Sequence, residues 1–105
     1  DFIHVSDTVK INLHFYESKA SGIYNVGTGK ARSFYDLAEI MKNLNGRGEI
    51  ENIPFPLDLR GKYQKFTEAE LVNLRRTGFS EEFLSLEEGL AQYFELLTSS
   101  NGLYM

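Results

Sequence analysis

Three short segments of the chain carry the hydrophobic pattern of β-strands. Residues 2–5 and 23–26 are mostly apolar runs bounded by polar residues or glycine, and residues 49–53 alternate weakly between polar and apolar positions. Runs of this length and composition predict short strands. The strand over 49–53 must end at Pro54, because a proline has no N–H to donate to a neighbouring strand.

Helical periodicity occupies the intervals between these strands and the end of the chain. Asp7 is a good N-cap for a helix over about 8–18, in which Val9, Leu13 and Tyr16 repeat at helical spacing. Three capping boxes predict the starts of the other helices: Ser33 with Asp36, Thr67 with Glu70, and Ser85 with Glu88. The first of these helices should end at Asn45-Gly46, the second at Gly78, and the third after Leu97.

The order of elements, β-α-β-α-β followed by two helices, predicts an α/β fold. Ligands of open α/β sheets bind beyond the carboxyl ends of the strands, which makes the loops 5–7, 27–32 and 54–66 candidates. The 105 residues have room for one domain or part of a larger one. We expect that domain over 1–98 and a tail over 99–105, and any deep pocket would need another domain to enclose it.

The composition excludes several classes of function. There is no cysteine, and the two histidines lack zinc-ligand spacing, so disulfides, thiolate metal sites and a zinc site are not expected. The net charge of −4 argues against nucleic acid as a partner, because phosphate neutralisation needs a basic face. No apolar run approaches the ~20 residues that span a bilayer, and we expect no secretory leader. These features predict a cytoplasmic protein without a membrane partner.

One local cationic segment stands out in this acidic chain. Arg60, Lys62 and Lys65 provide three positive charges without an intervening acid, and the aromatic residues Tyr63 and Phe66 lie among them or just after them. Such a segment suggests a contact with a small anion such as the diphosphate of a nucleotide-sugar. For the cationic residues the alternative is a solvated loop rich in long side chains. For the aromatic residues the alternative is that Phe55 and Phe66 belong to the core and Tyr63 packs at its rim.

The familiar catalytic and phosphate-binding motifs are missing. The turn Gly27-Thr28-Gly29-Lys30 precedes a helix, as phosphate loops do, but it satisfies neither G-x-x-x-x-G-K-[ST] nor G-x-G-x-x-G, which favours a structural turn. No G-x-S-x-G and no Tyr-x-x-x-Lys occurs in these residues. Read from its residues alone, the chain therefore contains no catalytic set.

Three sequence landmarks follow one another along the chain: DFIHVSD at 1–7, GIYNVGTG at 22–29 and SLEEGL at 85–90. Together they resemble the C-terminal half of an extended short-chain dehydrogenase/reductase, of the nucleotide-sugar epimerase and dehydratase family. Within this family, IPFP at 53–56, LRGKYQKFT at 59–67 and the residues to Gly78 are similar to the enzymes that epimerise ADP-linked heptoses. The resemblance runs from residue 1 to about 97.

The resemblance implies an NADP-dependent isomerase. In that family, bound NADP takes hydride from C6 of the sugar, leaving a ketone, and returns it to the opposite face. The glycine-rich cofactor loop and the Tyr-x-x-x-Lys lie in the N-terminal half, which is not among these 105 residues. The resemblance therefore implies no catalytic, cofactor-binding or metal-binding residue in this chain, and the chain alone should be inactive.

Substrate contacts are also carried over from the family. Tyr63 matches a family substrate-contact position, and Arg60 and Lys62 would lie near the diphosphate of the ADP-sugar. The family arginine that contacts substrate would directly precede Asp1. Asp7 matches a family position but reads equally well as a helix cap. The chain begins inside a predicted strand, so we expect a piece of a longer protein whose partners are its own NADP-binding half and further copies, as in the family's pentamers.

Two alternatives stay open. The sugar assignment depends mainly on residues 53–78, so another NAD(P)-dependent nucleotide-sugar epimerase or dehydratase is the first. The second is a free-standing interaction module without catalysis, favoured by the compact length and the acidic last helix. A module should unfold cooperatively by itself, whereas half of an enzyme should expose the apolar face that its other half covers.

Overall fold

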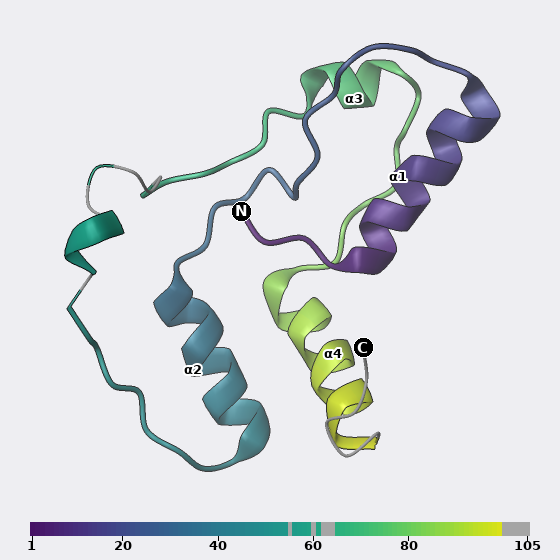
Figure 1. Ribbon diagram of the computed structural model, residues 1–105. Helices are drawn as coiled ribbons and strands as arrows, with labels where there is room; N and C mark the ends of the chain where they lie inside the picture. Colours follow the sequence, from purple (N-terminus) through teal and green to yellow (C-terminus); the bar gives the residue numbers. More distant parts are fainter. Residues whose placement is uncertain (55, 60, 62–64, 100–105) are drawn as a thin grey trace.

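The computed structural model describes residues 1–54, 56–59, 61 and 65–99 (Figure 1). These residues form four α-helices, a single turn of 3-10 helix and no β-strand. The elements are α1 (Val5–Ser18), α2 (Phe34–Asn45), η1 (Leu57–Leu59), α3 (Val72–Arg76) and α4 (Leu86–Ser99). The predicted α/β fold, with its β-α-β-α-β order, is therefore wrong, and the described chain is helical.

The segments predicted as strands run as extended chain without forming a ladder. The first is cut short because α1 begins at Val5, inside the predicted range. The second is exposed, with Ile23 98% accessible to solvent. The third belongs to the long connection from α2 to α3, which passes around the outside of α2 (Figure 1). A short apolar run forms a strand only where an adjacent strand can pair with it, so the hydrophobic pattern alone does not predict these strands.

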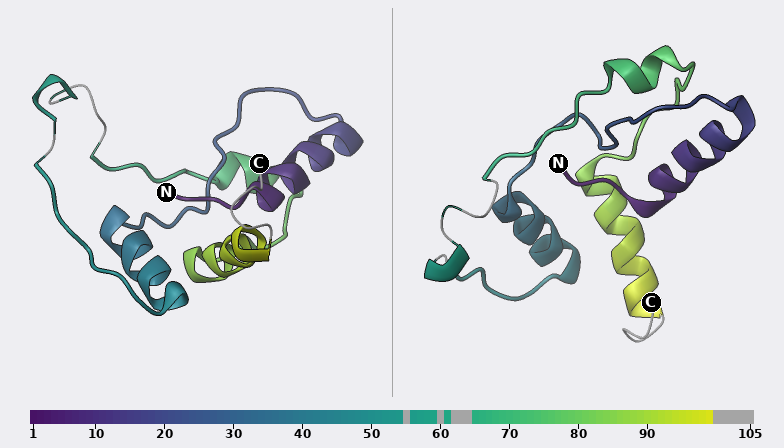
Figure 2. Two further views of the ribbon diagram at one scale, coloured as in Figure 1. Left: turned by 60° about the horizontal axis from the view of Figure 1, so that its bottom comes forward. Right: turned by 45° about the horizontal axis from the view of Figure 1, so that its top comes forward.

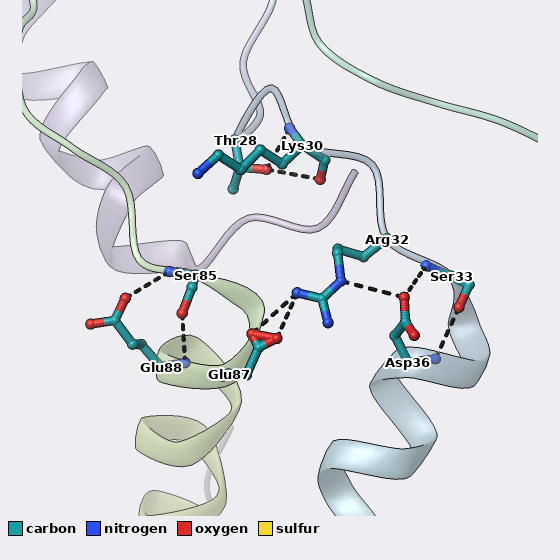
Figure 3. Close-up of polar contacts among 8 residues, drawn as sticks. All are labelled: Thr28, Lys30, Arg32, Ser33, Asp36, Ser85, Glu87 and Glu88. Carbon is teal, nitrogen blue, oxygen red and sulfur yellow. Dashed lines mark hydrogen bonds and ion pairs between the residues drawn. The ribbon is translucent and has the colours of Figure 1, made fainter.

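The capping boxes predicted for α2 and α4 are confirmed. Asp36 N–H donates to Ser33 Oγ over 3.0 Å, and Ser33 N–H donates to Asp36 Oδ2 over 3.2 Å. The reciprocal bonds between Ser85 and Glu88 are both 3.1 Å long. These boxes fix where the two helices start, and the N-termini of α2 and α4 lie near each other (Figure 3).

Two other predicted caps are wrong. His4 is the N-cap of α1, since its Nδ1 accepts the Ser6 N–H over 3.1 Å, and Asp7 lies buried in the first turn. Thr67 does not open a helix, because its carbonyl and hydroxyl oxygens accept from the backbone nitrogen of Asp1 instead. Glu70 accepts from Val72 N–H over 3.0 Å, so α3 starts later than predicted.

The core is small and lies between α1, α3 and the segment that follows α3. Ile11, Leu74 and Phe79 are its buried residues. Four partly buried side chains pack around them: Ile3, Phe15, Leu71 and Phe83. α2 and α4 lie side by side away from this core (Figure 2).

The molecule is open for its length. Its radius of gyration is 16.5 Å, against about 13 Å for a compact domain of this size. Its accessible surface is 8420 Å², against about 6,000 Å² for a compact monomer of this mass. The excess is exposed in part on α1, where an outer stripe faces solvent: Val5, Val9, Leu13 and Tyr16, the last being 82% exposed. A surface of this kind is typical of a face that another part of a protein covers.

Among the described helices, none combines the length and the apolar character that a membrane crossing requires.

Candidate functional site

The three residues predicted to contact substrate, Arg60, Lys62 and Tyr63, lie outside the described residues, as does Phe55. The chain on the far side of this segment is described from Lys65 onward. Phe66 is 72% exposed, so the alternative that places it in the core is wrong. Residues 65–67, which follow the predicted contact segment, are therefore exposed, and Thr67 is held in place by hydrogen bonds.

Thr67 is fixed by Asp1. The backbone nitrogen of Asp1 lies 2.8 Å from Thr67 O and 3.0 Å from Thr67 Oγ1. The carboxylate of Asp1 accepts four hydrogen bonds, from Thr28 N–H, Thr28 Oγ1–H, Gly29 N–H and Ala69 N–H, at 2.7–2.9 Å. We call this arrangement the Asp1 junction. It joins three segments that are distant in sequence, at residues 1, 28–29 and 67–69.

The Asp1 junction explains the glycine turn. A Cβ built on Gly27 would lie 2.7 Å from Asp1 Oδ2 and 2.8 Å from the Cβ of Ala69, so only glycine fits there. The turn does offer its backbone N–H groups to an anion, as phosphate loops do, but the anion is the carboxylate of Asp1. Because Thr28 and Gly29 already donate to Asp1, the structural interpretation of this turn holds.

A cavity of about 370 Å³ shares Thr28 with the Asp1 junction. Its wall combines cationic, acidic and aromatic side chains. The charged ones are Lys30, Arg32, Arg75, Glu82 and Glu88. The others are Phe2, Thr28, Phe83, Leu84, Ser85 and Leu86. We call this space the Arg75 cavity.

Arg32 connects the two helix N-termini at this cavity (Figure 3). Its Nη1 lies 2.6 Å from Glu87 Oε1 on α4, and its Nε lies 3.3 Å from Asp36 Oδ2 on α2. The hydrogen bond from Arg32 holds the pKa of Glu87 below its ordinary value. The pKa of Asp36 is also lowered, chiefly by the Ser33 N–H and hydroxyl and then by Arg32. Arg32 is thus neutralised by its neighbours.

Arg75 and Lys30 differ from Arg32 in this respect. Arg75 Nη1 donates to Phe79 O over 3.1 Å and to Glu81 O over 2.7 Å, and its guanidinium carbon lies 4.8 Å from the centre of the Phe83 ring. Among the described residues, neither Arg75 nor Lys30 forms an ion pair with a carboxylate. The Arg75 cavity therefore has two positive charges that form no ion pair within the described part of the chain, although Glu82 and Glu88 lie in the same wall.

Sequence reasoning missed both the Asp1 junction and the Arg75 cavity. Asp1 directly precedes the predicted strand over 2–5, and Arg75 lies within the family motif that ends at Gly78. Each role depends on contacts between residues far apart in sequence, for which the chain gives no local signal.

No group of metal-ligating side chains able to hold an ion occurs in the described part of the chain. No protein-family model matches the chain.

Proposed function

We propose that this chain is the substrate-binding part of an ADP-L-glycero-D-manno-heptose 6-epimerase. The enzyme interconverts ADP-D-glycero- and ADP-L-glycero-D-manno-heptose by NADP-dependent oxidation and re-reduction at C6. Tyr63 contacts the ADP-sugar, and Arg60 and Lys62 bind its diphosphate through charge-assisted hydrogen bonds. NADP and the catalytic Tyr-x-x-x-Lys belong to the N-terminal half, so these residues alone do not turn over substrate.

The observation that carries the proposal is the contact between Asp1 and Thr67. In the resembled family, the arginine that contacts substrate stands directly before the position of Asp1. The backbone nitrogen of Asp1 lies 2.8 Å from Thr67 O, and Thr67 closes the motif that contains Tyr63. This contact supports a substrate edge at which Thr67 and the position before Asp1 lie close together.

The open surface of the molecule supports a second part of the proposal, the need for an N-terminal half. The chain exposes roughly 2,400 Å² more surface than a compact monomer of its mass. This excess is larger than the ~800 Å² that each partner buries in a standard interface. The outer stripe of α1 is part of that excess. A free-standing interaction module would have closed more of this surface around its own core, so the observation favours the enzyme.

The test uses the complete enzyme, with both halves, and measures turnover of ADP-D-glycero-D-manno-heptose. Tyr63→Phe and Arg60→Ala should each raise the KM for the ADP-sugar about tenfold or more, since a hydrogen bond to a charged group contributes ~1.5–3 kcal/mol. The Kd for NADP should stay unchanged. Tyr35→Phe and Arg47→Ala are matched controls, because Tyr35 is exposed on α2 and Arg47 is exposed just after it.

An unchanged KM in both site variants would remove Tyr63 and Arg60 from the site. Turnover of a different nucleotide-sugar, with none of the ADP-heptose, would replace the substrate and keep the family. A complete protein that binds no NADP and turns over no nucleotide-sugar would overturn the enzyme assignment.

A further inference from the structure

The Arg75 cavity contains two cations, Arg75 and Lys30, that form no ion pair among the described residues. Arg75 is half-buried and contacts two carbonyl oxygens and an aromatic face, whereas the carboxylates of Glu82 and Glu88 in the same wall form no ion pair with it. Taking a cation partly out of water without a directly paired counter-charge is costly. An anion in the cavity would pair with Arg75 directly.

We propose that the Arg75 cavity binds the phosphate group of a small ligand, with Arg75 and Lys30 as its cationic donors. The inference does not depend on the proposed function, since none of the residues that carry it is among the predicted substrate contacts Arg60, Lys62 and Tyr63. The volume of about 370 Å³ lies within the range of small-molecule sites, roughly 300–1,000 Å³.

The guanidinium of Arg75 is held ready for such a ligand. The two carbonyl bonds use Nη1, and the ring of Phe83 lies against the guanidinium at 4.8 Å. These contacts fix the plane of the group while leaving its other nitrogen atoms with donors to spare. A fixed, planar donor loses little entropy when it binds the oxygens of a phosphate.

Lys30 and Ser85 add to the wall from two other segments. Lys30 is exposed at the end of the glycine turn, with no carboxylate partner among the described residues. Ser85 Oγ accepts from Glu88 N–H, which leaves its hydroxyl proton free to donate to an anion. The cavity thus combines a rigid cation, a mobile cation and a neutral donor.

The acidic residues of the wall limit the affinity and provide a test. Glu88 is engaged in its capping box, where the Ser85 N–H donates to its Oε1. Glu82 lines the cavity and is exposed, so its charge repels a bound phosphate. Removing the charge of Glu82 should therefore tighten binding, a result that no purely structural role of these residues predicts.

The experiment titrates the 105-residue chain with inorganic pyrophosphate by calorimetry, at constant ionic strength. Lys30→Gln should weaken binding about fivefold and Arg75→Gln tenfold or more. Glu82→Gln should tighten binding about twofold. Lys10→Gln is the matched control, because Lys10 is exposed on α1 and lines no part of this cavity, and its Kd should stay within about twofold of the wild type.

Orthophosphate and AMP are compared in the same way to identify the source of the phosphate. Equal or tighter binding of AMP indicates a phosphate ester, and binding of orthophosphate with exclusion of AMP indicates the free ion. No measurable binding of any of the three probes overturns the proposal. So does equal affinity in the wild type, Lys30→Gln and Glu82→Gln, and these two exposed positions keep the test decisive even if Arg75→Gln fails to fold.

Discussion

The carboxylate of Asp7 accepts the backbone N–H of Leu84 over 2.9 Å, across 77 positions of sequence. Asp7 lies in the first turn of α1, and Leu84 lies just before the capping box of α4. The other carboxylate oxygen, Oδ1, is buried and has no hydrogen-bond partner among the described residues. One buried side chain therefore sets the spacing between the start of α1 and the start of α4, and only half of its acceptor capacity is used.

Asp7→Ala should lower the free energy of unfolding by about 1–3 kcal/mol, because it leaves the Leu84 N–H without its acceptor. Asp7→Asn should cost less, since the amide oxygen can still accept that bond. Urea denaturation measures the change, and hydrogen exchange of the Leu84 amide localises it. Asn12→Ala, on the exposed side of α1, is the control and should leave that amide unaffected. An unchanged exchange rate in Asp7→Ala would contradict the role of this bond.

Two glycines should respond in opposite ways to a single added methyl group. Gly27→Ala places a Cβ within 2.7–2.8 Å of Asp1 Oδ2 and the Ala69 Cβ, which the Asp1 junction cannot accommodate. We expect a loss of about 1–3 kcal/mol in unfolding free energy. The matched substitution is Gly89→Ala in α4, where the nearest atoms belong to His4 at 3.5 Å, an ordinary contact.

Gly89→Ala should therefore stabilise the chain by roughly 0.5–1 kcal/mol, because alanine has the higher helix propensity. Both variants are compared with the wild type by urea denaturation at one protein concentration. Equal effects of the two substitutions would show that packing around Gly27 is looser than the contacts of the Asp1 junction imply.

Local signals in the sequence predicted local structure well. The Ser33 and Ser85 capping boxes and the stop at Gly46 are all present, because each depends on residues within four positions of one another. Asp7 shows where this reasoning ends. An aspartate before a helical pattern favours an N-cap, but His4 provides that acceptor, and Asp7 is free to bind Leu84 from inside the helix.

The strand predictions were wrong because a strand forms only when a second segment pairs with it. The run at 23–26 has the composition of a buried strand, but no described segment pairs with it. At Thr28 and Gly29, the backbone N–H groups donate to the side chain of Asp1 rather than to another backbone. The Asp1 junction was unpredictable for the same reason, since nothing near Asp1 in sequence indicates Ala69 as its partner.

The ion pair between Arg32 and Glu87 should give a defined pH dependence. The pKa of Glu87 is lowered in the folded chain, first by the hydrogen bond from Arg32. A carboxyl whose folded pKa is depressed stabilises the fold above its ordinary pKa of about 4.3, and this contribution is lost as the pH falls through the folded value. Stability should therefore decline as the pH is lowered from about 5 toward 3.

Arg32→Gln should return the pKa of Glu87 toward its ordinary value, as measured by carbon NMR of the carboxyl group. Arg76→Gln removes the same charge at an exposed position of α3, where the described residues show no ion pair, and should leave the pKa of Glu87 in place. A Glu87 pKa that moves equally in both variants would indicate a general effect of net charge instead of this contact.

The outer stripe of α1 should make the isolated chain self-associate. Val5, Val9, Leu13 and Tyr16 present an uncharged apolar face to solvent, and water favours the burial of such a face against any available apolar surface. Leu13→Lys places a charge in the middle of the stripe and should shift the chain toward the monomer in sedimentation velocity at concentrations of about 50 μM, where the wild type should associate. Asn43→Lys adds the same charge at an exposed position of α2 and should sediment like the wild type. Circular dichroism establishes that both variants keep their helices. If Leu13→Lys associates as strongly as Asn43→Lys, another exposed surface holds the copies together. The outer stripe would then not be the face that a second half of the protein covers.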